Sequence, residues 1–235
     1  MKTITETLYA RRGGAPFYPV ITAHSGCEGT PDNSIEHIRT ALSCGAEMFE
    51  IDVHEHDGVL YLTHNKLEDY TNCPTLAQCF ELTAAHPTMC INCDVKTFGL
   101  TAQVIELAKK YGMESRILFT GSVAPEELPA LNASQSDWWL SLWCSDHEPE
   151  DLENACGTYR ELDNLYRIIN LDQKMVNDRV IRTMEETGHM LSVWTVNSED
   201  ALRRLMGTGV VANITTRIPK LALEIRKELI AKSEQ

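Results

Sequence analysis

The sequence alternates between short apolar runs and amphipathic stretches along almost its whole length. The apolar runs have the length of β-strands, and the stretches between them carry apolar residues at helical spacing. The expected strands cover residues 20–24, 48–53, 59–63, 90–96, 116–120, 138–144, 166–171, 190–196 and 210–215. The expected helices cover residues 33–44, 75–85, 100–111, 125–132, 176–187, 199–206 and 219–231, with one more near Glu153. Strands that alternate with helices in this way indicate a parallel sheet covered by helices.

The number of these units in a chain of 235 residues constrains the fold class. About eight strand–helix units in this length predict a TIM-type (β/α)8 barrel that spans residues 1–235 as a single α/β domain. A doubly wound open sheet is the main alternative. It lacks support because no Gly-rich phosphate loop follows the first expected strand. No linker, low-complexity segment or charge block marks a domain boundary.

The net charge of −13 limits the partners of the chain. An acidic surface repels phosphate backbones, so we expect no nucleic-acid partner. No segment approaches the ~18 consecutive apolar residues of a membrane span. Residues 1–14 are polar and lack the apolar core of a secretory signal. We therefore expect a cytoplasmic protein without stable membrane insertion, while the sequence gives no indication of oligomeric state.

Two of the eight cysteines form a C-x-x-C motif, Cys90 and Cys93. No second pair follows, and both residues fall in an expected strand, where side chains three apart point to opposite faces. This geometry disfavours a zinc site. In a cytoplasmic chain we expect the cysteines to be reduced.

Polar residues near the ends of the expected strands are the candidates for an active site, because active sites of such barrels lie at the C-terminal ends of the strands. Glu50 and Asp52 share one face of the second strand, and Asp94 and Lys96 share one face of the strand that covers residues 90–96. A buried carboxylate is costly unless it is paired or bound to a metal. A single carboxylate at a strand end would be read as a salt-bridged or solvated residue, but three together predict a site for Mg²⁺ or Ca²⁺.

Histidines also end two of the extended segments. His24 and His64 are candidates for a general acid and a general base, since imidazole exchanges protons near neutral pH. The alternative for either one is a hydrogen-bonded structural histidine. His54 and His56 continue the alternation of the carboxylates. We expect them to lie past the strand end, in the turn before the Asp57-Gly58 pair, and away from the site.

These residues belong to a longer series of motifs. The series consists of His24-Ser25-Gly26, Pro31-Asp32-Asn33-Ser34, Gly45-Ala46, Glu50-Ile51-Asp52-Val53, Asp57-Gly58, His64-Asn65, Asp94-Val95-Lys96, Trp194-Thr195-Val196-Asn197, Gly209-Val210 and Ile214-Thr215-Thr216-Arg217. In order and spacing it resembles the signature of the glycerophosphodiester phosphodiesterase family. The resemblance implies a TIM-type barrel whose substrate is a small phosphodiester such as glycerophosphocholine. The implied products are glycerol 3-phosphate and an alcohol.

The resemblance also implies roles for individual residues. It implies that Glu50, Asp52 and Asp94 hold a divalent cation and that His24 and His64 form the acid–base pair. Three further residues would contact or orient the substrate: Lys96 would bind the phosphate, Asn33 would orient groups at the first helix, and Trp194 would line the pocket.

The chain departs from the family pattern at four positions. Ser25 stands where the family usually has an arginine, so the substrate-binding position after the first histidine lacks a bidentate phosphate contact. Asn65 replaces an aspartate, Asp94 replaces a glutamate, and Thr216 replaces an aspartate. Arg217 is a candidate to supply the missing positive charge.

These departures leave two other functions open. An acidic residue followed two positions later by a lysine also resembles sphingomyelinase D, so the chain could act on another phospholipid or lysophospholipid. Alternatively, it could be a binding protein whose catalysis is impaired. Retention of both histidines, the three carboxylates and the lysine argues against that second alternative.

Overall fold

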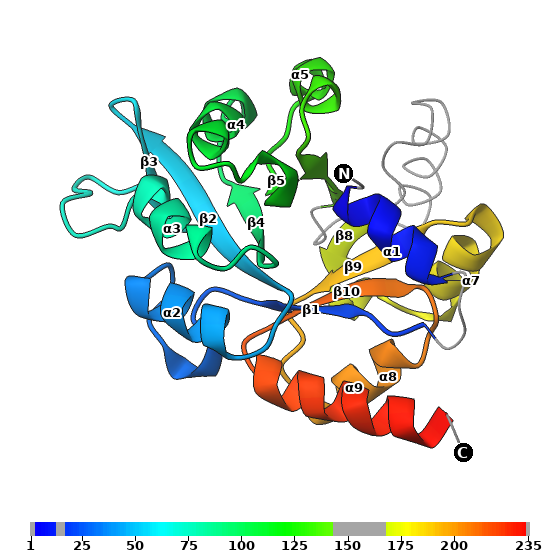
Figure 1. Cartoon of the computed structure of the whole chain (residues 1–235). Helices are drawn as coiled ribbons and strands as arrows, with labels where there is room; N and C mark the ends of the chain where they lie inside the picture. Colours follow the sequence, from blue (N-terminus) through cyan, green and yellow to red (C-terminus); the bar gives the residue numbers. More distant parts are fainter. Residues whose placement is uncertain (1–2, 13–16, 143–167, 234–235) are drawn as a thin grey trace.

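The computed structural model describes residues 3–12, 17–142 and 168–233. Parallel strands in this part of the chain form a nearly closed barrel with helices outside it (Figure 1). The parallel strands are β1 (Val20–Ala23), β2 (Met48–His56), β4 (Cys90–Val95), β5 (Ile117–Gly121), β6 (Asp137–Trp138), β7 (Leu140–Ser141), β8 (Ile168–Asp172), β9 (Met190–Trp194) and β10 (Val211–Thr216). Their order around the barrel is β6-β5-β4-β2-β1-β10-β9-β8-β7.

Strands β6 and β7 close the barrel between them. β6 pairs with β5 and β7 pairs with β8, so the two short strands together occupy one strand position of the barrel, which is interrupted at Trp139. The backbone N–H of Trp139 donates to Phe119 O at 3.0 Å, which ties the interruption to β5. The predicted TIM-type barrel is therefore confirmed, and the open doubly wound sheet is excluded.

Among the described connections, a helix follows every one of these strands except β6, which is followed directly by β7, and the strand β3 (Val59–Leu62) comes between β2 and its helix. The helices are α2 (Ile35–Ser43), α3 (Leu76–Ala84), α4 (Thr101–Lys110), α5 (Leu128–Ala133), α7 (Asp178–Thr187), α8 (Glu199–Met206) and α9 (Pro219–Ser233). Capping residues set several of their N-termini: the side chain of Ser34 accepts from His37 N, and Thr75 and Gln78 form a capping box. The expected helix near Glu153, and residues 143, 144, 166 and 167 of two expected strands, lie outside the described residues.

The outward faces of the strands pack under these helices. On β2, for example, Phe49, Ile51 and Val53 are completely buried. The C-x-x-C cysteines lie on opposite faces of β4, as expected. Cys93 is in the core under the helices, and Cys90 packs toward the interior of the barrel. None of the described helices is long and apolar enough to cross a bilayer.

The N-terminal end of the barrel is filled and covered. Leu8, Met48, Trp139 and other apolar residues form a cluster there, beneath the helix α1 (Ile4–Arg12). Asp137 Oδ2 accepts from Thr5 N at 2.6 Å, and Trp139 Nε1 donates to Thr5 Oγ1 at 2.9 Å. The sequence patterns did not predict α1. Because this end is closed, a ligand reaches the barrel interior from the C-terminal end.

The placement of His54 and His56 in a turn was wrong. Both belong to β2, which continues beyond the barrel because the antiparallel strand β3 (Val59–Leu62) pairs with it. The turn itself is the Asp57-Gly58 pair. Both residues have positive φ angles, 50° and 78°, as a two-residue type I′ hairpin requires.

Candidate active site

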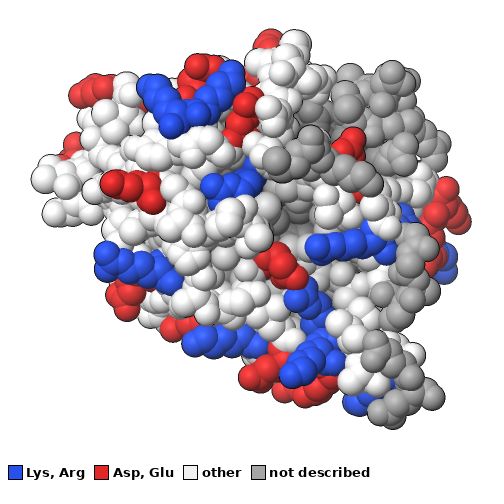
Figure 2. Space-filling model, viewed as in Figure 1, with Lys and Arg blue, Asp and Glu red and all other residues white. Residues whose placement is uncertain are grey.

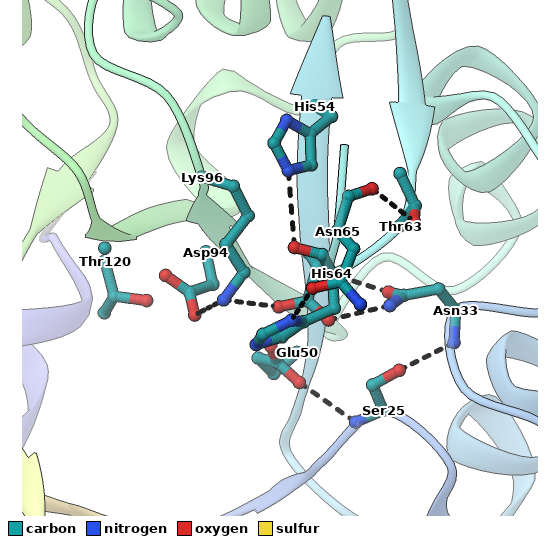
Figure 3. Close-up of polar contacts among 12 residues, drawn as sticks. Ser25, Asn33, Glu50, His54, Thr63, His64, Asn65, Asp94, Lys96 and Thr120 are labelled. Atoms are coloured by element: carbon teal, nitrogen blue, oxygen red, sulfur yellow. Dashed lines mark hydrogen bonds and ion pairs between the residues drawn. The ribbon is translucent and has the colours of Figure 1, made fainter. Parts of the chain in front are cut away.

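A cavity of about 350 Å³ opens at the C-terminal ends of the barrel strands. Its described lining residues are His24, Glu50, Asp52, His64, Asn92, Asp94, Lys96, Thr120, Ser141, Asn170, Trp194, Thr195, Thr215 and Arg217. Figure 3 shows the part of this site that β2, β4, the end of β5 and the loops after β1 and β3 contribute. On the face of the molecule drawn in Figure 2, acidic and basic side chains are interspersed.

Three carboxylates converge in this cavity. Asp52 pairs in register with Asp94 on the adjacent strand, and Glu50 lies two residues before Asp52 on the same face. Glu50, Asp52 and Asp94 offer oxygen atoms that all lie within 4.8 Å of one another. Burial and the two neighbouring carboxylates raise the pKa of Glu50. Burial likewise raises the pKa of Asp94, although Lys96 opposes this effect.

Lys96 lies between two of the carboxylates. Its Nζ is 2.7 Å from Asp52 Oδ1 and 2.6 Å from Asp94 Oδ2. Burial acts against its charge, but the two carboxylates outweigh burial and raise the pKa of Lys96. Burial also acts against ionisation of Asp52, but Lys96 and the amide of Asn33 leave the pKa of Asp52 below its usual value.

The cluster fits a divalent cation. One positive charge from Lys96 cannot balance three ionised carboxylates. Within the described part of the chain, the buried Oδ1 of Asp94 has no hydrogen-bond partner. A buried acceptor without a partner is costly, and a hard cation with oxygen ligands would satisfy it.

Asn33 and Ser25 form a support behind the carboxylates (Figure 3). Asn33 Nδ2 donates to Asp52 Oδ2 at 2.7 Å, and Asn33 Oδ1 accepts from Asp52 N at 2.9 Å. Ser25 N donates to Glu50 Oε2 at 2.9 Å, and Ser25 Oγ accepts from Asn33 N at 2.6 Å. Ser25 is only 1% exposed and is not among the described residues that line the cavity. It therefore holds Asn33 instead of facing the cavity.

The two candidate acid–base histidines line the same cavity. The Nδ1 of His24 lies 2.7 Å from the carbonyl oxygen of Ser25, so Nδ1 carries the proton and Nε2 holds the lone pair of the neutral ring. Burial lowers the pKa of His24, and the nearby positive charge of Arg217 adds to this effect. The Nδ1 of His64 lies 3.1 Å from Asn65 Oδ1, so Asn65 orients this ring.

His54 supports His64 from outside the cavity. Its Nε2 lies 3.3 Å from His64 O, and its Nδ1 lies 3.4 Å from Thr97 Oγ1. Because His54 continues the alternation of positions 50 and 52 along the strand, the sequence could have indicated that it lies near the site. His56 stacks on Tyr70 with ring centroids 4.6 Å apart, and it does not line the cavity.

The rest of the cavity lining consists mainly of neutral polar side chains to which the sequence patterns assigned no role. Asn170 Oδ1 accepts from Ser192 Oγ at 2.8 Å, and Thr120 Oγ1 donates to Asn92 Oδ1 at 2.9 Å. In the sequence, a polar residue within an apolar strand, at a position whose side chain points into the barrel, could have identified these residues. Trp194 also lines the cavity, at the end of β9.

Gly121 makes room for one of the carboxylates. It ends β5 with a φ of 84°, and a Cβ atom there would overlap both Asp94 Oδ1 and Val95 O. Only glycine combines this backbone conformation with so close an approach.

Comparison with known proteins matches this fold to solved structures. No family model and no curated protein matches the chain. Glycerophosphodiester phosphodiesterases from Agrobacterium tumefaciens and Thermotoga maritima superpose with TM-scores of 0.65 and 0.70 at 20% and 17% identity. The alignments cover 88% and 89% of this chain and 99% of both relatives. A phosphodiesterase from Oleispira antarctica, solved with the product sn-glycerol 3-phosphate, superposes with a TM-score of 0.69 at 16% identity, over 94% of this chain and 99% of that one. The chain has the fold of these phosphodiesterases.

Proposed function

We propose that this chain is a metal-dependent phosphodiesterase that hydrolyses glycerophosphodiesters to glycerol 3-phosphate and an alcohol. The observation that carries the proposal is the cluster of Glu50, Asp52 and Asp94 with His24 and His64 in one cavity. The shared fold supports it, because one of the superposed phosphodiesterases holds sn-glycerol 3-phosphate as product. Metal ligands alone would fit many reactions, whereas the two histidines beside them fit transfer of protons to and from a reacting group.

The three carboxylates would hold Mg²⁺ or Ca²⁺, since both prefer oxygen ligands. A bound divalent cation would polarise a phosphoryl oxygen and offset the negative charge that develops on phosphorus. Asn33 and Ser25 keep Asp52 and Glu50 oriented for this role. A bound cation would share Asp52 and Asp94 with Lys96. The ammonium group of Lys96 could then contact the phosphate.

The two histidines would divide the proton transfers. The ring of His24 is neutral near pH 7, because its pKa is lowered, and its Nε2 lone pair can accept a proton from the attacking water, whose oxygen forms the new bond to phosphorus. His64 would then donate a proton to the leaving alkoxide, with Asn65 and His54 holding it in place. Trp194 would line the pocket beside the substrate.

A substrate panel tests the proposal. Purified protein is incubated with glycerophosphocholine, glycerophosphoethanolamine, lysophosphatidylcholine and sphingomyelin, with Mg²⁺ or Ca²⁺ and with or without chelator. We expect free glycerol 3-phosphate from the glycerophosphodiesters and none after chelation. A cyclic phosphate as the final product from the lysophospholipid or sphingomyelin would favour the sphingomyelinase D-like alternative. If metal-loaded protein releases nothing from any of them, the proposal is overturned. Location in the cytoplasm and the lack of a nucleic-acid partner stay predictions.

A further inference from the structure

Besides the two histidines, two side chains with a permanent positive charge are found among the described residues that line the cavity, Lys96 and Arg217. They differ in their ion-pair partners and in the exposure of their side chains. Lys96 is 11% exposed and contacts two carboxylates of the candidate metal site at 2.7 and 2.6 Å. Arg217 follows β10 and is 43% exposed, and it lies outside that carboxylate cluster. Arg217 is thus the cation that is available to an anionic ligand.

The side chain of Arg217 has one ion-pair partner in the described part of the chain. Its Nη2 lies 3.0 Å from Asp32 Oδ2, and the carboxylate of Asp32 is 53% exposed. An ion pair this exposed contributes little to stability, so a phosphoryl oxygen can replace Asp32 at small cost. The rest of the guanidinium keeps further N–H donors in a planar fork, which matches the oxygens of a phosphate.

The main chain of Arg217 is held at both of its polar groups. Its N–H donates to Asn197 Oδ1 at 2.9 Å, and its carbonyl oxygen accepts from Glu28 N at 2.8 Å. The loop therefore presents the arginine at a fixed place while the exposed side chain can change partner. Pre-ordering of the main chain reduces the entropy lost on binding.

The guanidinium lies over the segment that follows β1. A Cβ atom on Gly26 would come within 3.2 Å of Arg217 Nη1 and would overlap Asp32 Oδ1. The absence of a side chain at Gly26 thus leaves the space that Arg217 and Asp32 occupy. This space adjoins Ser25, whose own side chain is buried behind the site.

We propose that Arg217 binds the phosphoryl group of the substrate, from the loop after β10, in place of the arginine that the family pattern has at position 25. Asp32 holds the guanidinium beside the cavity until the substrate arrives. The inference rests on the proposed function for the identity of the substrate, but it concerns any phosphoryl group in this cavity.

Binding of sn-glycerol 3-phosphate to the Mg²⁺-loaded protein tests the inference by calorimetry. Arg217→Gln removes the charge, Arg217→Lys keeps it without the fork, and Asp32→Asn is the matched control that breaks the same ion pair. We expect Arg217→Gln to weaken binding on the order of tenfold or more, the typical effect of losing a hydrogen bond between charged groups. Arg217→Lys should weaken binding less, and Asp32→Asn should bind as well as the wild type or more tightly. Unfolding temperatures of all variants establish that the fold is kept.

Two results overturn the inference. One is wild-type affinity of Arg217→Gln for sn-glycerol 3-phosphate. The other is an equal loss in Asp32→Asn, which would mean that the pair only supports the loop. If the wild type binds sn-glycerol 3-phosphate through Arg217 but releases none from any glycerophosphodiester, the proposed function fails and this inference stands. If the wild type turns over a glycerophosphodiester and Arg217→Gln leaves its kcat/KM unchanged, this inference fails and the proposed function stands. If the wild type does neither, both are overturned.

Discussion

Removal of the Asn33 side chain should weaken metal binding without deleting a metal ligand. Asn33 holds Asp52 at two points, through the carboxylate at 2.7 Å and through the backbone N–H at 2.9 Å. Its φ of 53° lies in the left-handed region, so Asn33→Gly removes the side chain while the backbone keeps an allowed conformation. The hydrogen bond of Asn33 also helps to lower the pKa of Asp52, so that pKa should rise in the variant.

The magnitude follows from the two lost hydrogen bonds. The bond to the charged carboxylate is worth roughly 1.5–3 kcal/mol, and leaving the buried N–H of Asp52 without a partner costs about 1–3 kcal/mol. We expect the metal-free variant to lose roughly 2.5–6 kcal/mol of its free energy of unfolding, the sum of the two terms. Residues that orient a metal ligand commonly change metal affinity about 10–100-fold, and we expect a loss in that range.

Calorimetric titration of Mg²⁺ or Ca²⁺ into metal-free protein measures the affinity, and urea unfolding measures the stability. Leu8→Ala is the control. It opens a cavity at the opposite end of the barrel at a cost of about 2–5 kcal/mol, and it touches no residue of the site. Unchanged metal affinity of Asn33→Gly would refute the reasoning, and so would an equal loss of affinity in Leu8→Ala.

Five further outcomes are expected. Exhaustive chelation should abolish turnover, because the three clustered carboxylates, two of them buried, cannot all stay ionised without a cation; persistent turnover would contradict a metal role. Adding the metal back at ~100 times its Kd should raise the Tm by roughly 5–10 °C. His24→Ala and His64→Ala should each lower kcat by on the order of 10²–10⁴ in steady-state assays, and a near-wild-type rate would remove that histidine from the mechanism. The pKa of His24 is lowered, so a base at this position stays unprotonated to a lower pH than an ordinary histidine. We therefore expect kcat/KM to decline only below the usual imidazole pKa of about 6.5. A decline that begins above that pH would argue against His24 as the base. Gly121→Ala should lower both the Tm and the metal affinity, since its Cβ would displace Asp94, with about 1–2 kcal/mol lost to the positive φ alone; unchanged values of both would mean that Asp94 is not confined in this way.

The convergence of the carboxylates could be predicted from local sequence. Side chains alternate between the faces of a strand, so the spacing of Glu50 and Asp52 already placed them together. Parallel strands in one barrel end at the same edge, which brings Asp94 to the same level. Both inferences need only the period of the strand and the direction of its neighbours. For the same reason the opposite faces of Cys90 and Cys93 were predictable.

The positions of loop side chains could not be predicted in this way. Ser25 and Arg217 are far apart in sequence, and each lies in a connection without periodicity. Their neighbours depend on how β1 and β10 pair, with Val20 opposite Asn213 and Ala23 opposite Thr216. That pairing carries the Arg217 guanidinium over Gly26, whereas local hydrogen bonding turns the side chain of Ser25 away from the cavity.

Long-range pairing also decided the remaining features. The β2 strand extends to His56 because β3 supplies partners for its backbone groups, which an isolated segment would have to satisfy with water. The helix α1 carries little amphipathic signal of its own, and it is placed by Leu8 and Thr5 against the end of the barrel. Local periodicity in the sequence thus determined which residues face the interior of the barrel. The tertiary structure decided which loops and termini meet over it, since those contacts depend on pairing between residues that are distant in the chain.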